Sequence, residues 1–299
     1  MTRIKPLPVL SALLACSLAA PPVTADDGVF DSNGVKIRYV TAGAGEAVVL
    51  IHGWMADSGM WGRDKSGETR LDTTGADGFR FIALDCRGHG KSDKPHAVDK
   101  YDAEVAADVV RLLDHLKVGK AHLIGYSSGA FVAGKVAATH PGRVLSVVYA
   151  GQAPVIGDPN PSDFSEVEAF AKAVDEGRDL GSYIIAVTPT GRPKPTEAQA
   201  RVVANILYGK KDVKAFAAAG RGFKHLAVTE DELKRCPAPV LFIHGERESE
   251  HVQGKVAAAR KRLGRGEVKV IPGGDHMTTL AKPEFRAALL DFLRANKAN

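Results

Sequence analysis

The sequence predicts an α/β protein with a doubly wound, mostly parallel β-sheet and a helical lid insertion. Three observations favour this fold class. Short apolar runs alternate with helical patterns along the chain, which is typical of strand–helix–strand units. Several of the runs are continuously apolar, as expected for strands that are buried on both faces of a parallel sheet. Glycine-bearing turns follow them, where open α/β sheets bind ligands.

The composition is that of an ordinary globular protein. The chain has 299 residues, of which 44% are hydrophobic and 25% charged. This length is enough for one sizeable core with an insertion. The formal net charge of +5 is mild and comes without a basic cluster, so we do not expect nucleic acid as a partner.

Residues 1–25 have the pattern of an export signal, in which basic residues precede an apolar stretch. Val23-Thr24-Ala25 provides a small-residue cleavage site. Leu13-Leu14-Ala15-Cys16 also resembles a lipoprotein processing box, in which Cys16 would carry a lipid that tethers the protein to a membrane. A retained N-terminal anchor is a third hypothesis. All three predict a place outside the cytoplasm, either secreted or periplasmic or lipid-anchored through Cys16.

The remaining cysteines, Cys86 and Cys236, follow and precede predicted strands. In a parallel sheet these positions lie at opposite ends, so we expect two free, half-buried thiols rather than a disulfide. Neither cysteine has a neighbouring Cys/His spacing that would hold a metal, and no metal site is expected.

The first part of the predicted core covers residues 26–151. Residues 35–41 alternate apolar and polar side chains, which favours an antiparallel edge strand. Glycine should end the first helix, because Gly119 follows its last apolar position. The other predicted elements are strands at 47–51, 79–84, 121–124 and 144–149 and helices from Asp102 to Leu116 and at 130–139.

Residues 152–239 are interrupted by proline and glycine and contain helical patterns at 167–174 and 197–207. We interpret this segment as a lid over the carboxyl edge of the sheet and expect it to supply the substrate contacts. The core then resumes over residues 240–299. Its predicted elements are strands at 239–244 and 267–271 and helices at 253–263 and 285–293.

The central motif is Gly125-Tyr126-Ser127-Ser128-Gly129, which lies between a predicted strand and a predicted helix. Such a turn holds its serine in a strained backbone conformation that lifts the hydroxyl clear of the sheet. The two glycines are needed because a side chain at either position would collide with the neighbouring strand and helix. Ser127 is therefore the candidate nucleophile.

Taken together, these motifs resemble the α/β-hydrolase superfamily, and in particular its lid-bearing, serine esterase-like members. The resemblance covers residues 34–295 in the chain order of the family. Its pieces are the serine turn, the strand 240–244 with Gly245, His52-Gly53-Trp54, Asp85-x-Arg87-Gly88-His89-Gly90-x-Ser92 and Gly273-Gly274-Asp275-His276.

A serine hydroxyl is a weak nucleophile at neutral pH and needs a base. His276, after the last strand, is the candidate, whereas His52 and His89 are expected to be structural loop residues. A carboxylate must orient the imidazole. The family places an aspartate where this chain has Glu248. Glu248 is thus the favoured acid, and the nearby Glu246 and Glu250 remain alternatives.

The oxyanion that forms during acyl transfer needs hydrogen-bond donors already in place. The backbone N–H of Ser128, at the start of a predicted helix, is one candidate. The resemblance implies the backbone N–H of Trp54 as the second. The side chains of Trp54 and Met55 are expected either to line the substrate pocket or to pack in the core.

The resemblance implies a serine hydrolase that cleaves a small-molecule carboxylic ester through an acyl-enzyme on Ser127, without a cofactor, and the pattern of residues 1–25 adds the expectation that it is exported. Serine at this position argues against epoxide hydrolases and dehalogenases, which use aspartate there. Hydrolysis of a lactone, a carbon–carbon bond or an aminoacyl group and peracid formation remain alternatives. A non-catalytic ligand-binding role also remains, because fold alone does not establish activity.

Overall fold

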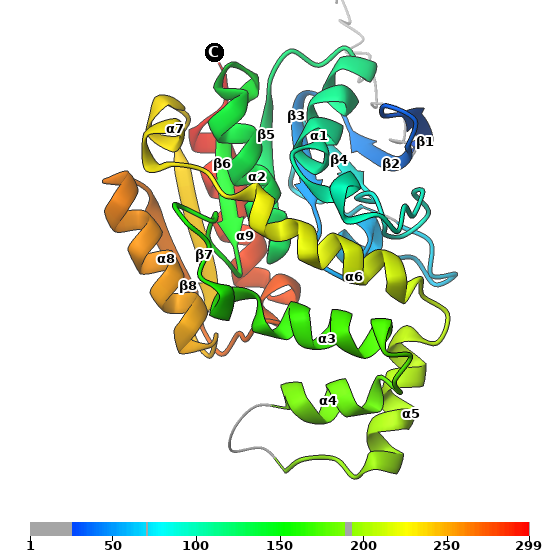
Figure 1. Ribbon diagram of the computed structural model, residues 1–299. Helices are drawn as coiled ribbons and strands as arrows, with labels where there is room; N and C mark the ends of the chain where they lie inside the picture. Colours follow the sequence, from blue (N-terminus) through cyan, green and yellow to red (C-terminus); the bar gives the residue numbers. More distant parts are fainter. Residues whose placement is uncertain (1–25, 70, 189–192, 299) are drawn as a thin grey trace, which may run out of the picture.

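The computed structural model describes residues 26–69, 71–188 and 193–298. The predicted export signal, with Cys16, lies outside these residues. The core is an eight-stranded sheet with the order β1-β2-β4-β3-β5-β6-β7-β8 (Figure 1). Its strands are β1 Asp26–Asp31, β2 Lys36–Gly43, β3 Glu46–Ile51, β4 Phe79–Leu84, β5 Ala121–Tyr126, β6 Val144–Ala150, β7 Val240–Gly245 and β8 Glu267–Ile271.

The six strands from β4 to β8 pair in parallel, and β1 and β2 are antiparallel additions at one side. The predicted doubly wound, mostly parallel sheet is confirmed. The antiparallel direction of β2 is also confirmed, but its edge position was wrong, because β1 pairs with its outer side. Most of β1 is exposed, so its sequence carries no apolar alternation that would have revealed it.

Four helices belong to the core: α1 Glu104–His115, α2 Ser128–Thr139, α8 Glu250–Leu263 and α9 Pro283–Ala295. The role predicted for Gly119, ending α1, was wrong. The helix ends at His115, and Lys117 then takes a left-handed conformation with φ 56°. The N–H of Val118 bonds to the carbonyl oxygen of Leu113 at 2.8 Å, a helix-ending arrangement that glycine usually provides.

The two faces of the sheet are covered differently. Helices α1, α2 and α8 pack on one face, around residues such as Val49 and Leu123. On the other face, α9 is the only described α-helix that contributes buried residues to the core around Leu50 and Phe81. The irregular segment between β3 and β4 covers the remainder through Leu71 and Ala76. A cover of this kind leaves room for a cavity.

Five helices lie between β6 and β7: α3 Ser165–Asp175, α4 Gly181–Val187, α5 Glu197–Tyr208, α6 Val213–Gly222 and α7 Glu230–Arg235. Helix α3 packs against α6 and α4 against α5 (Figure 1). Helices α3 and α5 fall where the sequence predicted helices. Helix α6 was not anticipated, because its buried positions are mostly alanine and glycine and therefore carry a weak apolar period.

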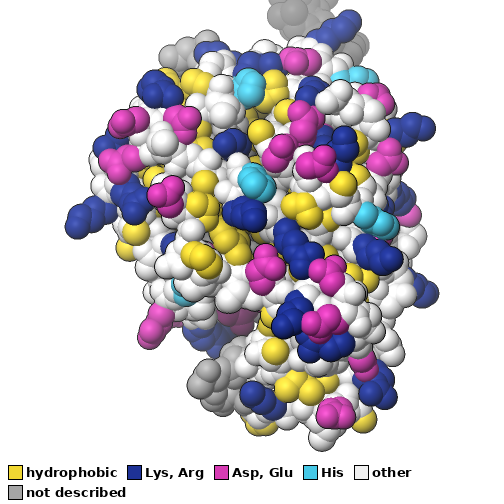
Figure 2. Space-filling view, in the orientation of Figure 1, with side chains coloured by type: hydrophobic (Ala, Val, Ile, Leu, Met, Phe, Trp, Pro, Cys, Tyr) yellow, Lys and Arg dark blue, Asp and Glu magenta, His cyan; other side chains and the backbone are white. Residues whose placement is uncertain are grey.

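Cys86 and Cys236 are free, as predicted, but both are buried rather than half-buried. Cys86 follows β4 and Cys236 precedes β7, and both pack into the core on the α1 and α2 face. Among the described residues, no helix has the length and apolar character needed to cross a membrane. Figure 2 shows basic and acidic side chains interspersed over the visible face, without a broad area of one sign.

Candidate active site

Ser127 lies in the tight turn between β5 and α2, with φ 54° and ψ −124°. The two glycines that flank it allow this turn to form. A Cβ atom on Gly125 would lie 2.2 Å from the carbonyl oxygen of Gly129, and one on Gly129 would lie 2.2 Å from that of Ile51. Both contacts are with backbone, which cannot give way easily. The turn therefore presents the Ser127 hydroxyl above the carboxyl end of the sheet.

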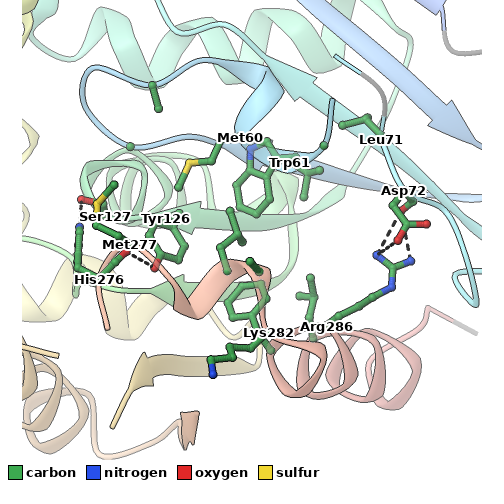
Figure 3. Close-up of a pocket in the computed structure, with 18 of the residues that line it drawn as sticks. Met60, Trp61, Leu71, Asp72, Tyr126, Ser127, His276, Met277, Lys282 and Arg286 are labelled. Atoms are coloured by element: carbon green, nitrogen blue, oxygen red, sulfur yellow. Dashed lines mark hydrogen bonds and ion pairs between the residues drawn. The ribbon is translucent and has the colours of Figure 1, made fainter. Parts of the chain in front are cut away.

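The three side chains predicted from sequence form one chain of hydrogen bonds. Ser127 Oγ lies 3.0 Å from His276 Nε2, and His276 Nδ1 lies 3.0 Å from Glu248 Oε2. A carboxylate can only accept a hydrogen bond, so Nδ1 carries the proton and Nε2 is left to accept from the serine hydroxyl. Figure 3 shows Ser127 and His276 side by side at one end of a cavity. Loops after β5, β7 and β8 supply these residues.

Of the three neighbouring glutamates, the structure places Glu248 at the imidazole. Glu248 is buried, and its second carboxylate oxygen accepts the backbone N–H of Ser249 at 3.0 Å. Glu246 is exposed and accepts the backbone N–H of Gly273. Glu250 is exposed at the start of α8. The geometry thus brings Glu248 to His276 and points the other two elsewhere.

The environment of His276 favours its charged form. Burial lowers the pKa of His276, but the hydrogen bond and the negative charge of Glu248 outweigh burial, and the net pKa is raised above the ordinary value. A base of this kind readily takes a proton from the serine hydroxyl as the reaction begins. The imidazolium that forms is stabilised by the carboxylate beside it.

Two further residues position His276 and were not foreseen from sequence. The Tyr126 hydroxyl donates to the carbonyl oxygen of His276 at 2.7 Å. Gly151 takes φ 63°, and a Cβ atom there would lie 3.5 Å from His276 Cε1. Tyr126 ends β5 and Gly151 directly follows β6, and only the folded sheet brings them to a histidine that is far away in sequence.

The turn after β3 lies against the serine. A Cβ atom on Gly53 would be 3.0 Å from Ser127 Cβ, and Trp54 directly follows. On the other side, Ser128 is the first residue of α2, and the first N–H groups of a helix have no partner within it. The two backbone N–H groups predicted as oxyanion donors therefore belong to the segments that flank Ser127.

His52 holds the turn after β3 in place. Its Nε2 accepts the backbone N–H of Cys86 at 3.0 Å, so its Nδ1 donates to the carbonyl oxygen of Gly53 at 2.7 Å. Burial lowers the pKa of His52, which keeps it neutral. His89 lies 5.1 Å away between ring centroids, and burial lowers its pKa to about 3. Both histidines occupy the structural positions that the motifs suggested.

A cavity of about 740 Å³ opens beside Ser127 and His276 (Figure 3). Its walls come from β3 and β4, from residues 53–72 between these strands and from residues 276–289. Tyr126 and Ser127 lie at one end. Among the described residues of the 152–239 segment, none lines this cavity. The expectation that this segment supplies the substrate contacts was therefore wrong for this cavity, because the cavity lies on the α9 face of the sheet.

Trp54 and Met55 occupy different places. Trp54 lines the cavity, and its ring also packs edge-on against Phe170 of α3, while Nε1 donates to the carbonyl oxygen of Phe216 at 2.9 Å. Met55 takes a left-handed conformation with φ 63° and packs on the cluster around Phe170. It does not line the cavity. Met55 therefore packs in the core, which was the alternative to lining the substrate pocket.

No group of three or more His, Cys, Asp or Glu side chains within the described part of the chain is placed to hold a metal ion.

The fold and this site define the class of the protein. Residues 46–283 match the family model of the alpha/beta hydrolase fold, and the chain belongs to this family. It is 31% identical over 279 residues to 2-(acetamidomethylene)succinate hydrolase from Mesorhizobium japonicum, with 89% of this chain and 94% of the relative covered. It is 27% identical to a non-heme haloperoxidase from Rhodococcus erythropolis, with 88% and 98% covered.

Some relatives match only in part. The chain is 37% identical to the dihydrolipoyllysine-residue acetyltransferase component of the acetoin cleaving system of Cupriavidus necator, but the match spans 39% of this chain and 29% of that protein. An epoxide hydrolase from Caballeronia sordidicola is 25% identical, with 84% and 71% covered. The relatives thus share a fold and differ in the reactions that their names describe.

Among solved structures, the chain resembles one from a study of carboxylesterases of Nitrososphaera gargenis. The TM-score is 0.72 at 24% identity, with 90% of this chain and 98% of that chain covered. At this identity the likeness supports the fold alone. The chain is therefore an α/β hydrolase, and its substrate must be argued from its own site.

Proposed function

We propose that this protein is an exported serine hydrolase that cleaves a carboxylic ester through an acyl-enzyme on Ser127. One observation carries the proposal: the chain of hydrogen bonds from Ser127 through His276 to Glu248, with 3.0 Å between the atoms of each bond. Nucleophile, base and orienting acid are the parts that acyl transfer by a serine needs.

In the first half of the reaction, His276 Nε2 takes the proton of the Ser127 hydroxyl while Oγ attacks the ester carbonyl. The oxyanion accepts hydrogen bonds from the backbone N–H groups of Trp54 and Ser128. The C–O bond to the alcohol then breaks, and His276 returns the proton to the leaving oxygen. In the second half, His276 activates a water that attacks the acyl group, which releases the carboxylic acid and restores Ser127.

The serine favours this chemistry over that of the epoxide hydrolase relatives. The acyl-enzyme is an ester of the serine hydroxyl, and water cleaves it once a base is present. Opening an epoxide with a serine would instead leave an ether, and the site offers no carbonyl for water to attack. The buried acid Glu248 is already engaged by His276 and does not provide a second nucleophile.

A fluorophosphonate probe tests the proposal directly, because it labels only an activated serine. We expect stoichiometric labelling of Ser127 and hydrolysis of p-nitrophenyl esters, and loss of both in Ser127→Ala. A folded protein with no labelling and no turnover of any ester would favour the non-catalytic role. Turnover that persists in Ser127→Ala would mean that another group is the nucleophile.

Export is proposed from the pattern of residues 1–25. Cleavage after Ala25 would retain every described residue of the sheet. N-terminal sequencing of the protein from its native host should find Asp26 first. A diacylglycerol adduct on Cys16 would instead establish lipid anchoring, and an intact start at Met1 would argue against processing.

A further inference from the structure

The cavity beside Ser127 has apolar walls. It runs between the sheet and α9 rather than under the helices that join β6 to β7. The sheet contributes Leu50 and Phe81, α9 contributes Phe285 and Leu289, and the turn after β3 contributes Met60 and Trp61. A pocket of about 740 Å³ falls within the range of sites that enclose most of a small-molecule ligand.

Arg286 and Asp72 line the end of the cavity that lies away from Ser127 and His276. Arg286 on α9 forms an ion pair with Asp72 at 3.2 Å. Its guanidinium also donates to the carbonyl oxygens of Asp72 and Thr74. Figure 3 shows this pair opposite Ser127 and His276. The two side chains are 34% and 54% exposed, so solvent lies just beyond them.

The opposite end lies at the nucleophile. Ser127 and His276 line the cavity there together with Met277, which is 85% exposed. A group that is covalently attached to Ser127 can extend inward along the apolar walls, while a leaving alcohol can depart outward past Met277. The acyl part of an ester stays on the enzyme through the second half of the reaction, so it is the part that gains most from contact with the apolar walls of the cavity.

We propose that this cavity binds the straight aliphatic acyl chain of the substrate, and that the contact of Arg286 with Asp72 and Thr74 is the end stop that sets the longest chain accepted. The inference rests on the proposed acyl-enzyme on Ser127. It moves the determinants of specificity from the helical segment to residues 60–72 and 280–289. Each methylene that leaves water should raise kcat/KM about fourfold until the cavity is full.

The first test is a series of p-nitrophenyl esters from acetate to palmitate. For the wild type we expect kcat/KM to rise with chain length to a maximum and then fall. In Arg286→Ala the maximum should move to longer chains, with the ratio of long-chain to short-chain kcat/KM raised about tenfold or more. The matched control is Arg294→Ala. Arg294 also reaches from α9 to this loop, at the carbonyl oxygen of Gly75, but does not line the cavity. It should keep the wild-type maximum.

A second variant acts in the opposite direction, and so keeps the test open if Arg286→Ala does not fold. Met60→Trp adds volume to the cavity wall, and the maximum should move to shorter chains. A maximum that stays in place in both folded variants would overturn the proposal. So would a rise of kcat/KM with the length of the alcohol, at constant acetyl group, in place of a rise with the acyl chain.

A binding measurement distinguishes failure of this inference from failure of the proposed function. Calorimetry of Ser127→Ala with saturated fatty acids should show affinity that grows with chain length up to the same limit, and the added Arg286→Ala change should extend it. Length-dependent binding in a protein whose wild type cleaves no ester would support the cavity and refute the esterase proposal. Ester turnover without any dependence on acyl length would refute the cavity alone.

Discussion

Contacts with neighbouring segments hold Ser127 in its strained backbone conformation. Its φ of 54° lies in a region that is costly for residues with a side chain. The conformation persists because Gly125 and Gly129 let β3, β5 and α2 approach closely. Its N–H also bonds to the carbonyl oxygen of Ala150 at 2.8 Å, which ties the turn to β6.

Gly129→Ala tests this close approach. The added methyl would lie 2.2 Å from the carbonyl oxygen of Ile51, so backbone must move, and we expect a loss of about 1–3 kcal/mol in the free energy of unfolding. Gly142→Ala is the control, because nothing lies within 4 Å of its added methyl. It should change the free energy by less than about 0.5 kcal/mol. Urea unfolding measures both, and equal losses would contradict the packing argument.

The negative charge of Glu248 is the feature that its contact with His276 makes important. Glu248→Gln keeps the shape of the side chain but removes the charge that stabilises the imidazolium, so kcat should fall by about 10³–10⁴. Glu246→Gln should lose less than about tenfold, because Glu246 is exposed and its charge is screened. Steady-state kinetics on one ester measures both variants. A large loss in Glu246→Gln alone would assign the acid to that residue.

The pH profile of the same variant gives an independent readout. His276 acts as a base only when neutral, so activity of the wild type should rise with pH through its raised pKa. Without the Glu248 charge, burial is the largest influence on His276 and lowers its pKa, against smaller raising effects of the Glu166 and Asp275 charges. The acid limb of kcat/KM against pH should therefore move to lower pH in Glu248→Gln. A limb that stays in place would show that Glu248 does not act on the histidine.

At the scale of elements, four of the described helices between β6 and β7, α3 to α6, form two layers. Helices α3 and α6 lie next to the site, where Trp54 packs on Phe170 and donates to the carbonyl oxygen of Phe216. Helices α4 and α5 pack on each other beyond them (Figure 1). The inner pair, α3 and α6, holds Trp54 of the candidate oxyanion turn, and no described residue of either pair lines the cavity. A lid role for the whole segment stays a prediction.

Removal of α4 and α5 tests whether these two helices are dispensable for catalysis. Replacing residues 178–208 with a short glycine–serine linker should leave kcat/KM for a short p-nitrophenyl ester within about threefold, because the catalytic geometry and the cavity walls come from elsewhere. Trp54→Ala is the contrasting change, since it removes the contacts with Phe170 and Phe216, and it should cost more than the deletion. Collapse of activity in a folded deletion variant would place a needed group in α4 or α5.

At the scale of the molecule, buried histidines make stability depend on pH. Burial lowers the pKa values of His52, His89 and His122, while the pKa of His276 is raised. A histidine with a lowered folded pKa binds fewer protons in the native than in the unfolded state below about pH 6.5. Its contribution therefore lowers the free energy of unfolding as pH falls through that value. The raised pKa of His276 has the opposite effect, because its contribution raises the free energy of unfolding as pH falls.

His89 should make a large contribution to this pH dependence, because its pKa of about 3 lies far below that of the unfolded chain. Between pH 7 and pH 5 the wild type should lose about 2 kcal/mol more than His89→Gln does. The exposed His140→Gln should follow the wild type. Urea unfolding at several pH values measures the difference. Equal pH dependence of the wild type and His89→Gln would mean that His89 is charged in the folded protein.

The sequence by itself determined the fold class, the order of most strands and helices, and the residues that converge on the site. These features have local signals. A buried parallel strand reads as a continuous apolar run, an amphipathic helix repeats with a period of 3.6 residues, and the turn at Ser127 needs glycine on both sides. The chain order of the motifs then predicted that Ser127 and His276 would meet, because both follow parallel strands, which end at one edge of the sheet.

Only the tertiary structure decided features that depend on contacts between distant segments. The exposed strand β1 is held by its pairing with β2, and the alanine-rich α6 by its packing against α3, so neither carries a strong period of its own. Glu248 differs from Glu246 and Glu250 only in where the loop directs its side chain. The cavity lies on the α9 face because a single α-helix and an irregular segment cover that face, and their separation is set by packing rather than by any motif.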